Sequence, residues 1–88
     1  MSRYQTTGEL LDVLECGTDA LIFIGDLLVR GSVVSVDILW LCQEPRTFDE
    51  LKAHCLDAFG EPTRRGLDEA VRASIRELMH AGVLAEVQ

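Results

Sequence analysis

The chain has 88 residues, of which 48% are hydrophobic and 26% are charged, a composition typical of one small globular domain with a modest core. Its formal net charge is −7, which argues against a general nucleic-acid binder because phosphate contacts need clustered Lys and Arg. A chain of this size also leaves little room for a deep active-site pocket of roughly several hundred Å³, so we expect no enzyme.

The first third of the chain predicts strands. Residues 1–8 are expected to form a flexible tail, and Leu10–Cys16 is compatible with either a strand or a short helix. Two apolar runs, Ala20–Ile24 and Leu27–Arg30, are separated by Gly25-Asp26, which is typical of a β-hairpin with a two-residue turn.

This turn gives the predicted hairpin two faces, and both are apolar. One face is expected to carry Ile22, Ile24, Leu27 and Val29, and the other Leu21, Phe23, Leu28 and Arg30. Helices can cover one face. The other then needs a partner, a dimer mate or the chain's own N-terminal segment.

Three helices are predicted after the hairpin. The first has Ser35 as N-cap, or begins a little earlier, and runs through Cys42 to a stop at Pro45, with Trp40 as a packing anchor. The second begins with a capping box formed by Thr47 and Glu50.

The second helix is expected to end at Gly60, and the third to run from Pro62-Thr63 to about Ala81 and to end at Gly82. Its core stripe comprises Leu67, Val71, Ser74, Ile75 and Leu78. Val83–Val87 is a short tail for which an extended conformation is one interpretation. The sequence therefore predicts an α+β fold with a single domain over residues 9–88.

Residues 36–51 read VDILWLCQEPRTFDEL. This segment resembles the pyrroloquinoline quinone biosynthesis protein D family, in which a helix ending in Ile-Leu-x-Leu-Cys meets a turn and then Arg-Thr-x-x-Glu-Leu/Ile. The likeness covers roughly residues 9–85 and includes Ala70–Ile75, Leu78 and the ending Ala81–Leu84. It implies a winged-helix-like fold, in which an antiparallel sheet of two or three strands precedes a three-helix bundle.

The resemblance also implies a function. Members of this family, including the stand-alone recognition proteins of lasso-peptide clusters, bind the leader segment of a ribosomally made precursor peptide. They present that peptide to a modifying enzyme or leader peptidase of the same pathway. The leader joins the edge of the third strand as an additional β-strand and packs against the third helix.

Carried onto this sequence, the resemblance places the strand part of the site at Leu27, Leu28, Val29 and Arg30. On the third helix, Arg65, Arg72 and Arg76 fall on nearly one stripe, and Ile75 and Met79 lie beside it. Arg, Ile and Met together are suited to an amphipathic, partly acidic peptide. The same Arg residues are also compatible with ordinary solvated helix charges, because Asp68 precedes Arg72 by four.

The sequence offers no convincing catalytic or metal-binding pattern. Cys16, Cys42 and Cys55 form no C-x-x-C pair, so we expect reduced thiols and a cytoplasmic protein, with Cys42 in the core. His54 and Cys55 are neighbours on a helix and point about 100° apart, which disfavours a Cys–His nucleophile. We expect no cofactor, and no metal because the Cys and His residues lack ligand-pair spacing. We also expect no signal peptide and no membrane contact, because the longest apolar run is too short to span a bilayer.

Two other functions stay open from the sequence. One is a winged-helix DNA-binding regulator with its third helix in the major groove, which the Arg stripe favours and the net charge opposes. The other is a structural subunit that forms a homodimer through its apolar sheet face.

Overall fold

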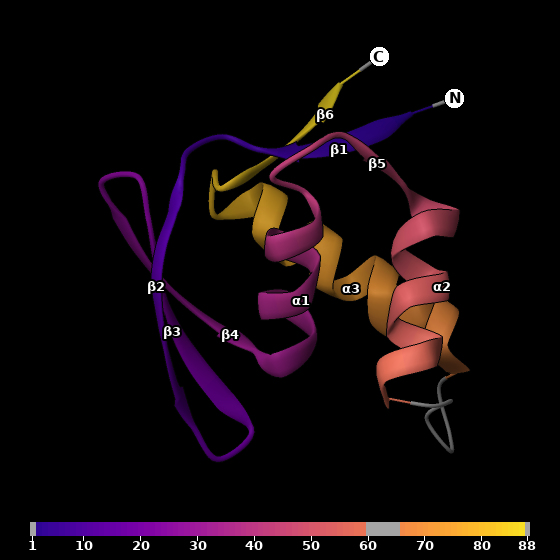
Figure 1. The fold of residues 1–88 in the computed structure, drawn as a ribbon, viewed down its shortest axis with the longest axis horizontal. Helices are drawn as coiled ribbons and strands as arrows, with labels where there is room; N and C mark the ends of the chain where they lie inside the picture. Colours follow the sequence, from indigo (N-terminus) through magenta and orange to yellow (C-terminus); the bar gives the residue numbers. More distant parts are fainter. Residues whose placement is uncertain (1, 60–65, 88) are drawn as a thin grey trace.

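The computed structural model describes residues 2–59 and 66–87, and these residues form six strands and three helices. In chain order they are β1 (Arg3–Thr6), β2 (Leu10–Cys16), β3 (Asp19–Ile24), β4 (Leu27–Ser32), α1 (Val33–Leu41), β5 (Arg46–Thr47), α2 (Phe48–Phe59), α3 (Gly66–His80) and β6 (Leu84–Val87). The prediction of an α+β fold is confirmed. The helices lie together beside a three-stranded sheet, and both ends of the chain meet at one end of the molecule (Figure 1).

Strands β2, β3 and β4 form an antiparallel sheet in which β3 is central. The predicted hairpin is confirmed: Ile24 pairs with Leu27, Ile22 pairs with Val29, and Gly25 has the positive φ of 55° that its tight turn requires. Residues Leu10–Cys16, which the sequence left between strand and helix, form β2. A bulge between Leu10 and Asp12 leaves Leu11 out of register.

Strands β5, β1 and β6 form a second antiparallel sheet, which the sequence did not predict. The expectation of a loose tail over residues 1–8 is wrong for Arg3–Thr6, because they pair with both β5 and β6. The Thr6 N–H also donates to the Cys42 carbonyl at 2.9 Å, and the Thr7 N–H donates to the Val83 carbonyl at 3.1 Å. The extended interpretation of Val83–Val87 is confirmed for Leu84–Val87, which form β6.

Helix α1 follows β4 without a loop. Its N-cap is Ser32, which agrees with the alternative of a start a little before Ser35, because the Ser32 hydroxyl accepts the Ser35 N–H at 3.3 Å. A Cβ at Gly31 would lie 3.0 Å from the Ser35 Cβ, so a larger residue here would crowd Ser35 at the junction of strand and helix. Trp40 is not a packing anchor, since 59% of it is exposed.

The predicted capping box at the start of α2 is confirmed. The Thr47 N–H donates to the Glu50 carboxylate at 2.9 Å, and the Glu50 N–H donates to the Thr47 hydroxyl at 3.2 Å. These bonds satisfy two backbone donors at the helix start. The predicted stop at Gly60 lies outside the described residues.

We predict that Thr47→Ala lowers the free energy of unfolding by about 1 kcal/mol, measured by urea titration.

The Thr47 N–H and hydroxyl hold the pKa of Glu50 below its ordinary value of 4.5. A depressed carboxyl pKa stabilises the fold above about pH 4.5, and this contribution is lost as the pH falls through the folded-state pKa. Glu50→Gln should therefore flatten the acid side of the stability profile, and an unchanged profile would contradict this role.

Helix α3 ends at His80, and Gly82 follows with a φ of 82°, which agrees with the predicted stop. Its predicted start at Pro62-Thr63 lies outside the described residues. The predicted core stripe is confirmed: the buried residues of α3 are Leu67, Val71, Ser74, Ile75 and Leu78.

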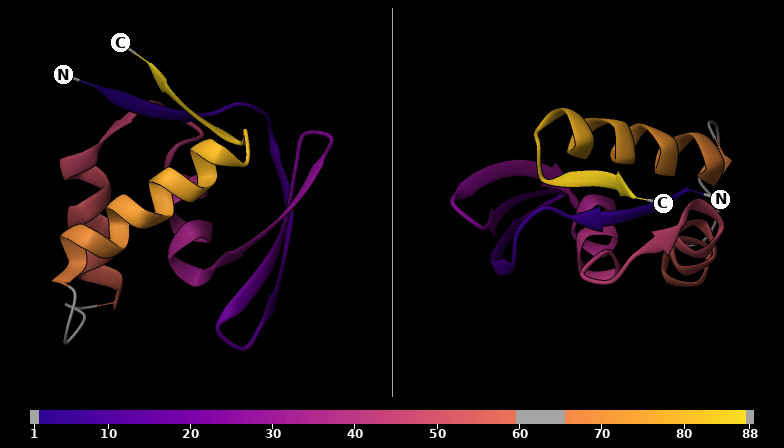
Figure 2. Two further views of the ribbon diagram at one scale, coloured as in Figure 1. Left: turned by 180° about the vertical axis from the view of Figure 1, so that it is seen from behind. Right: turned by 90° about the horizontal axis from the view of Figure 1, so that it is seen from above.

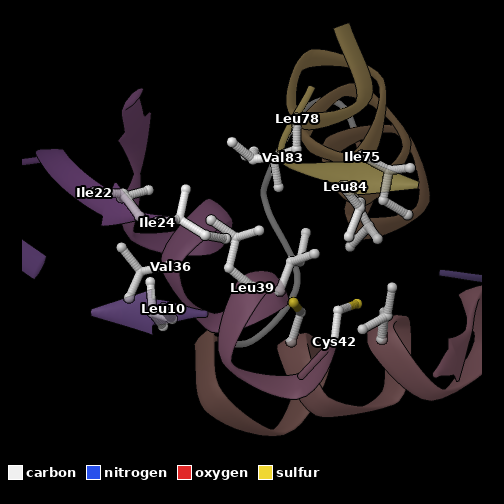
Figure 3. Packing of buried hydrophobic residues seen from close by; sticks show 14 of the residues in the cluster. Leu10, Ile22, Ile24, Val36, Leu39, Cys42, Ile75, Leu78, Val83 and Leu84 are labelled. Carbon is white, nitrogen blue, oxygen red and sulfur yellow. The ribbon is translucent and has the colours of Figure 1, made fainter. Parts of the chain in front are cut away.

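The core lies between the inner face of the β2–β4 sheet and the helices. Ile22 and Ile24 point from β3 toward Leu39 of α1, and Ile75 and Leu78 approach from α3 (Figure 3). Because the helices cover the inner face of the sheet, the opposite face of this sheet is left uncovered.

Candidate functional site

The outer face of the β2–β4 sheet carries large apolar side chains that face solvent. Residues directly opposite each other on neighbouring strands share a face, and by this rule one face carries Leu14, Leu21, Phe23 and Leu28. Their exposed fractions run from 36% to 59%. The two faces expected for the hairpin are thus distinguished: Ile22 and Ile24 are buried, and the uncovered face is that of Leu21, Phe23 and Leu28.

Strand β4 is an edge of its sheet, with β3 as its hydrogen-bonded neighbour on one side. The tight turn is closed by a bond between Ile24 and Leu27, and hydrogen-bonded and non-hydrogen-bonded pairs then alternate along the ladder. The backbone N–H and C=O groups of Leu27 and Val29 therefore point toward β3. Those of Leu28 and Arg30 point outward, away from the sheet.

A cavity of about 440 Å³ lies between this edge and α3. We call it the β4–α3 groove; it is lined by Arg30 of β4, by Arg76, Glu77 and His80 of α3, and by Ala81. Seen from behind, α3 lies in front, with the three-stranded sheet beside its C-terminal half (Figure 2, left).

The charges of the groove differ in how they are engaged. Arg30 donates to the Asp19 carboxylate at 2.9 Å, and this hydrogen bond and charge raise the pKa of Arg30. Arg76 makes no hydrogen bond or ion pair with any residue in the described ranges 2–59 and 66–87. Arg76 is therefore the cation best able to receive a carboxylate from outside the chain.

A second cavity, of about 510 Å³, lies on the other side of α3. We call it the Tyr4–Met79 cavity; it is lined by Tyr4 of β1, Phe48 of α2, and Arg72, Ile75, Arg76, Met79 and His80 of α3. Arg76 and His80 line both hollows, because these exposed residues lie on the ridge of α3 that separates the two hollows. The two hollows therefore border each other along this ridge.

Arg72 is held in place by its neighbours. Its Nε donates to the Asp68 carboxylate at 2.8 Å, and its guanidinium lies 4.3 Å from the centre of the Phe48 ring. Lys52 approaches Asp68 at 3.3 Å, and the bonds from Arg72 and Lys52 lower the pKa of Asp68. Arg72 therefore forms the pair with Asp68 on its own helix that the interpretation as an ordinary helix charge predicted.

The structure brings together only part of the site predicted from sequence. Arg30 and Arg76 meet at the β4–α3 groove, and Leu28 lies on the edge beside it. Arg72, Ile75 and Met79 line the Tyr4–Met79 cavity instead, and Ile75 also belongs to the core.

The remaining predicted residues lie apart from both hollows. Leu27 and Val29 turn their backbone groups toward β3, and Leu27 is exposed near the hairpin turn. Arg65 lies outside the described residues. Sequence reasoning missed Glu77, His80 and Tyr4, although the spacing of four between Arg76 and His80 indicated a shared face.

The cysteines differ in accessibility, and this gives a second prediction. Cys42 and Cys55 are buried, which confirms Cys42 as a core residue, whereas Cys16 is exposed. Burial raises the pKa of the Cys42 thiol to about 12 and raises that of Cys55. Because the thiolate is the nucleophile, a chromogenic disulfide reagent should modify Cys16 at least about 100-fold faster than the other two. Equal rates for all three thiols in the folded protein would contradict the described core.

Two further observations concern other classes of site. Within residues 2–59 and 66–87, no group of three or more His, Cys, Asp or Glu side chains is placed to hold a metal ion. No helix among the described residues is long and apolar enough to cross a membrane.

The chain matches no protein-family model, and no curated protein or solved structure is detectably similar to it.

Proposed function

We propose that this chain is a non-catalytic peptide-recognition domain that binds an extended segment of another polypeptide at the edge of β4. The observation that carries the proposal is the row of outward-facing backbone groups at Leu28 and Arg30 on the β4 edge, the edge from which Arg30 lines the β4–α3 groove. An added strand gains affinity through such groups, and the groove beside it receives alternate side chains. We further propose that the sheet β2–β4 and the three helices form a winged-helix-like unit.

The resemblance to the pyrroloquinoline quinone biosynthesis protein D family names the occupant. The proposed ligand is the leader segment of a ribosomally made precursor peptide, which the domain presents to a modifying enzyme or leader peptidase. This resemblance is carried by residues 36–51, which cover most of α1, the turn, β5 and the start of α2, and by Ala70–Ile75, Leu78 and Ala81–Leu84. The peptide class rests on this resemblance alone.

The charge distribution favours a peptide over DNA. The described part of α3 carries Arg72 and Arg76 together with Asp68, Glu69 and Glu77. Arg72 is engaged by Asp68, so the helix offers few cations for phosphates. A helix with this balance of charges is poorly suited to the major groove.

The experiment is a selection followed by titration. Random 15-residue peptides displayed on phage are selected against the purified chain, and enriched sequences are synthesised with a fluorescent label. We expect saturable binding in a polarisation titration and enrichment of alternating apolar residues, since one side of an added strand borders Leu28 on the outer face. Failure to enrich any peptide would overturn the proposal.

Sheared DNA serves as the competing ligand in the same titration at low salt. We expect excess DNA to leave the fluorescence polarisation of the bound peptide unchanged. Displacement of the peptide by DNA, with affinity falling steeply as salt is raised, would favour the nucleic-acid alternative and contradict the proposal.

A further inference from the structure

The Tyr4–Met79 cavity is basic in an acidic protein. The chain has a net charge of −7, yet within the part of the chain that the structure describes the cavity is lined by Arg72, Arg76 and His80 and by no acidic side chain. The rest of its lining is apolar or aromatic: Tyr4, Phe48, Ile75 and Met79. We infer that this cavity is a second anchoring subsite for the bound polypeptide, and that it takes an aromatic or large aliphatic side chain next to an Asp or Glu.

The two parts of the lining suit the two parts of that pair. Phe48 already has the Arg72 guanidinium against one face of its ring, and Arg72 is fixed by Asp68. Met79 is 38% exposed and has a flexible thioether side chain that can adapt to an incoming ring. Arg76, which has no partner in the described residues, supplies the charge for the carboxylate.

This subsite rests on the proposed function, because it is joined to the β4–α3 groove by shared residues. Arg76 and His80 form the ridge between the two hollows. A helix with its side chains is about 10–12 Å wide, and an extended residue spans about 3.3–3.6 Å. A peptide lying along β4 would therefore need about three to four residues to cross the ridge before its anchor enters the cavity.

Charge complementarity selects this occupant over a second copy of the chain. Two copies of the chain, each with a net charge of −7, repel each other, whereas a short acidic and apolar segment carries little like charge and matches both the Arg side chains and the apolar lining. Dimerisation at this cavity is the competing outcome. The NMR experiment below would detect it as amide lines that broaden with rising protein concentration when no peptide is added.

The first test uses a probe too short to form a β-strand. The dipeptide N-acetyl-Asp-Phe-amide is titrated into ¹⁵N-labelled protein to about 10 mM, a range suited to a weak ligand of this size. We expect shifts at the amides of Tyr4, Phe48 and Met79, and at least about fivefold weaker binding of N-acetyl-Lys-Phe-amide and N-acetyl-Asp-Gly-amide. Absence of shifts at these amides, or equal binding of the Lys dipeptide, would overturn the inference.

Two variants that add the same charge locate the effect. Met79→Glu should abolish dipeptide binding, because it adds a negative charge and removes the apolar contact. Leu56→Glu is the matched control, since it adds the same charge at an exposed residue of α2 that lines neither hollow, and it should leave dipeptide binding unchanged. Unchanged binding to Met79→Glu would contradict the assignment, provided that the variant keeps the circular dichroism of the parent.

The dipeptide separates this inference from the proposed function. One outcome is that a selected peptide binds the parent chain but not a variant with a blocked β4 edge, and the dipeptide does not bind. This outcome would overturn only the second subsite. The opposite outcome is that the dipeptide binds but no peptide is found to add to β4. This outcome would overturn only the proposal of strand addition. Joining the dipeptide to a selected peptide through three or four residues should raise affinity at least about tenfold, since the second contact becomes intramolecular.

Discussion

Replacing Leu28 by proline is expected to abolish peptide binding while the domain stays folded. Leu28 lies in a non-hydrogen-bonded pair with Phe23, so its N–H points outward and contributes no bond to the β3–β4 ladder. Proline removes this donor and places a ring where the incoming carbonyl would lie. We expect affinity for a selected peptide to fall at least about 20-fold, measured by polarisation titration.

Two control variants make this result specific. Glu15 lies one residue from its own turn on β2, as Leu28 does on β4, and β2 is the opposite edge of the same sheet. Glu15→Pro therefore blocks the β2 edge and leaves the β4 edge free, so this variant should bind peptide normally. Leu28→Ala keeps the N–H and removes only side-chain contacts, and its loss should be smaller than that of Leu28→Pro. Equal loss in Leu28→Pro and Glu15→Pro, or none in either, would contradict recognition at the β4 edge.

Replacing Leu39 by alanine is expected to have the largest effect on stability. Leu39 has no exposed surface and lies where α1 meets both the sheet and α3 (Figure 3). Removing its side chain leaves a cavity that the surrounding elements cannot fill, so we expect a loss of about 2–5 kcal/mol in the free energy of unfolding. Urea unfolding followed by circular dichroism measures this loss.

The neighbouring Trp40 provides the matched control on the same helix. Trp40 is larger than Leu39 but is 59% exposed, so Trp40→Ala should change stability by about 0.5 kcal/mol or less. A larger loss for Trp40→Ala than for Leu39→Ala would contradict the described orientation of α1.

The features that the sequence predicted correctly depend on residues close together in the chain. The Gly25-Asp26 turn and the reciprocal bonds of Thr47 and Glu50 involve neighbours at most three apart, and the stripe of α3 repeats with the helical period. Such local patterns are sufficient because the same few residues supply both the signal and the stabilising contacts.

The features that the sequence missed depend on distant partners. Arg3–Thr6 has no strong strand pattern of its own, and its partners β5 and β6 lie more than 40 and 75 residues further along the chain. The same missing strand concealed Tyr4 as a wall of the second cavity. Arg72 and Arg76 share a stripe on a helical wheel, but only the folded structure shows that Arg76 borders both hollows whereas Arg72 borders the Tyr4–Met79 cavity alone.

The central claim is that a peptide adds to β4 as a strand, and amide hydrogen exchange tests it most directly. The Leu28 and Arg30 amides point outward in the free protein, whereas those of Leu27 and Val29 are already bonded toward β3 and serve as internal controls. With a saturating selected peptide, we predict that exchange at Leu28 and Arg30 slows at least about tenfold, while that of Leu27 and Val29 changes less. Unchanged exchange at Leu28 and Arg30 in the saturated complex would contradict strand addition at this edge.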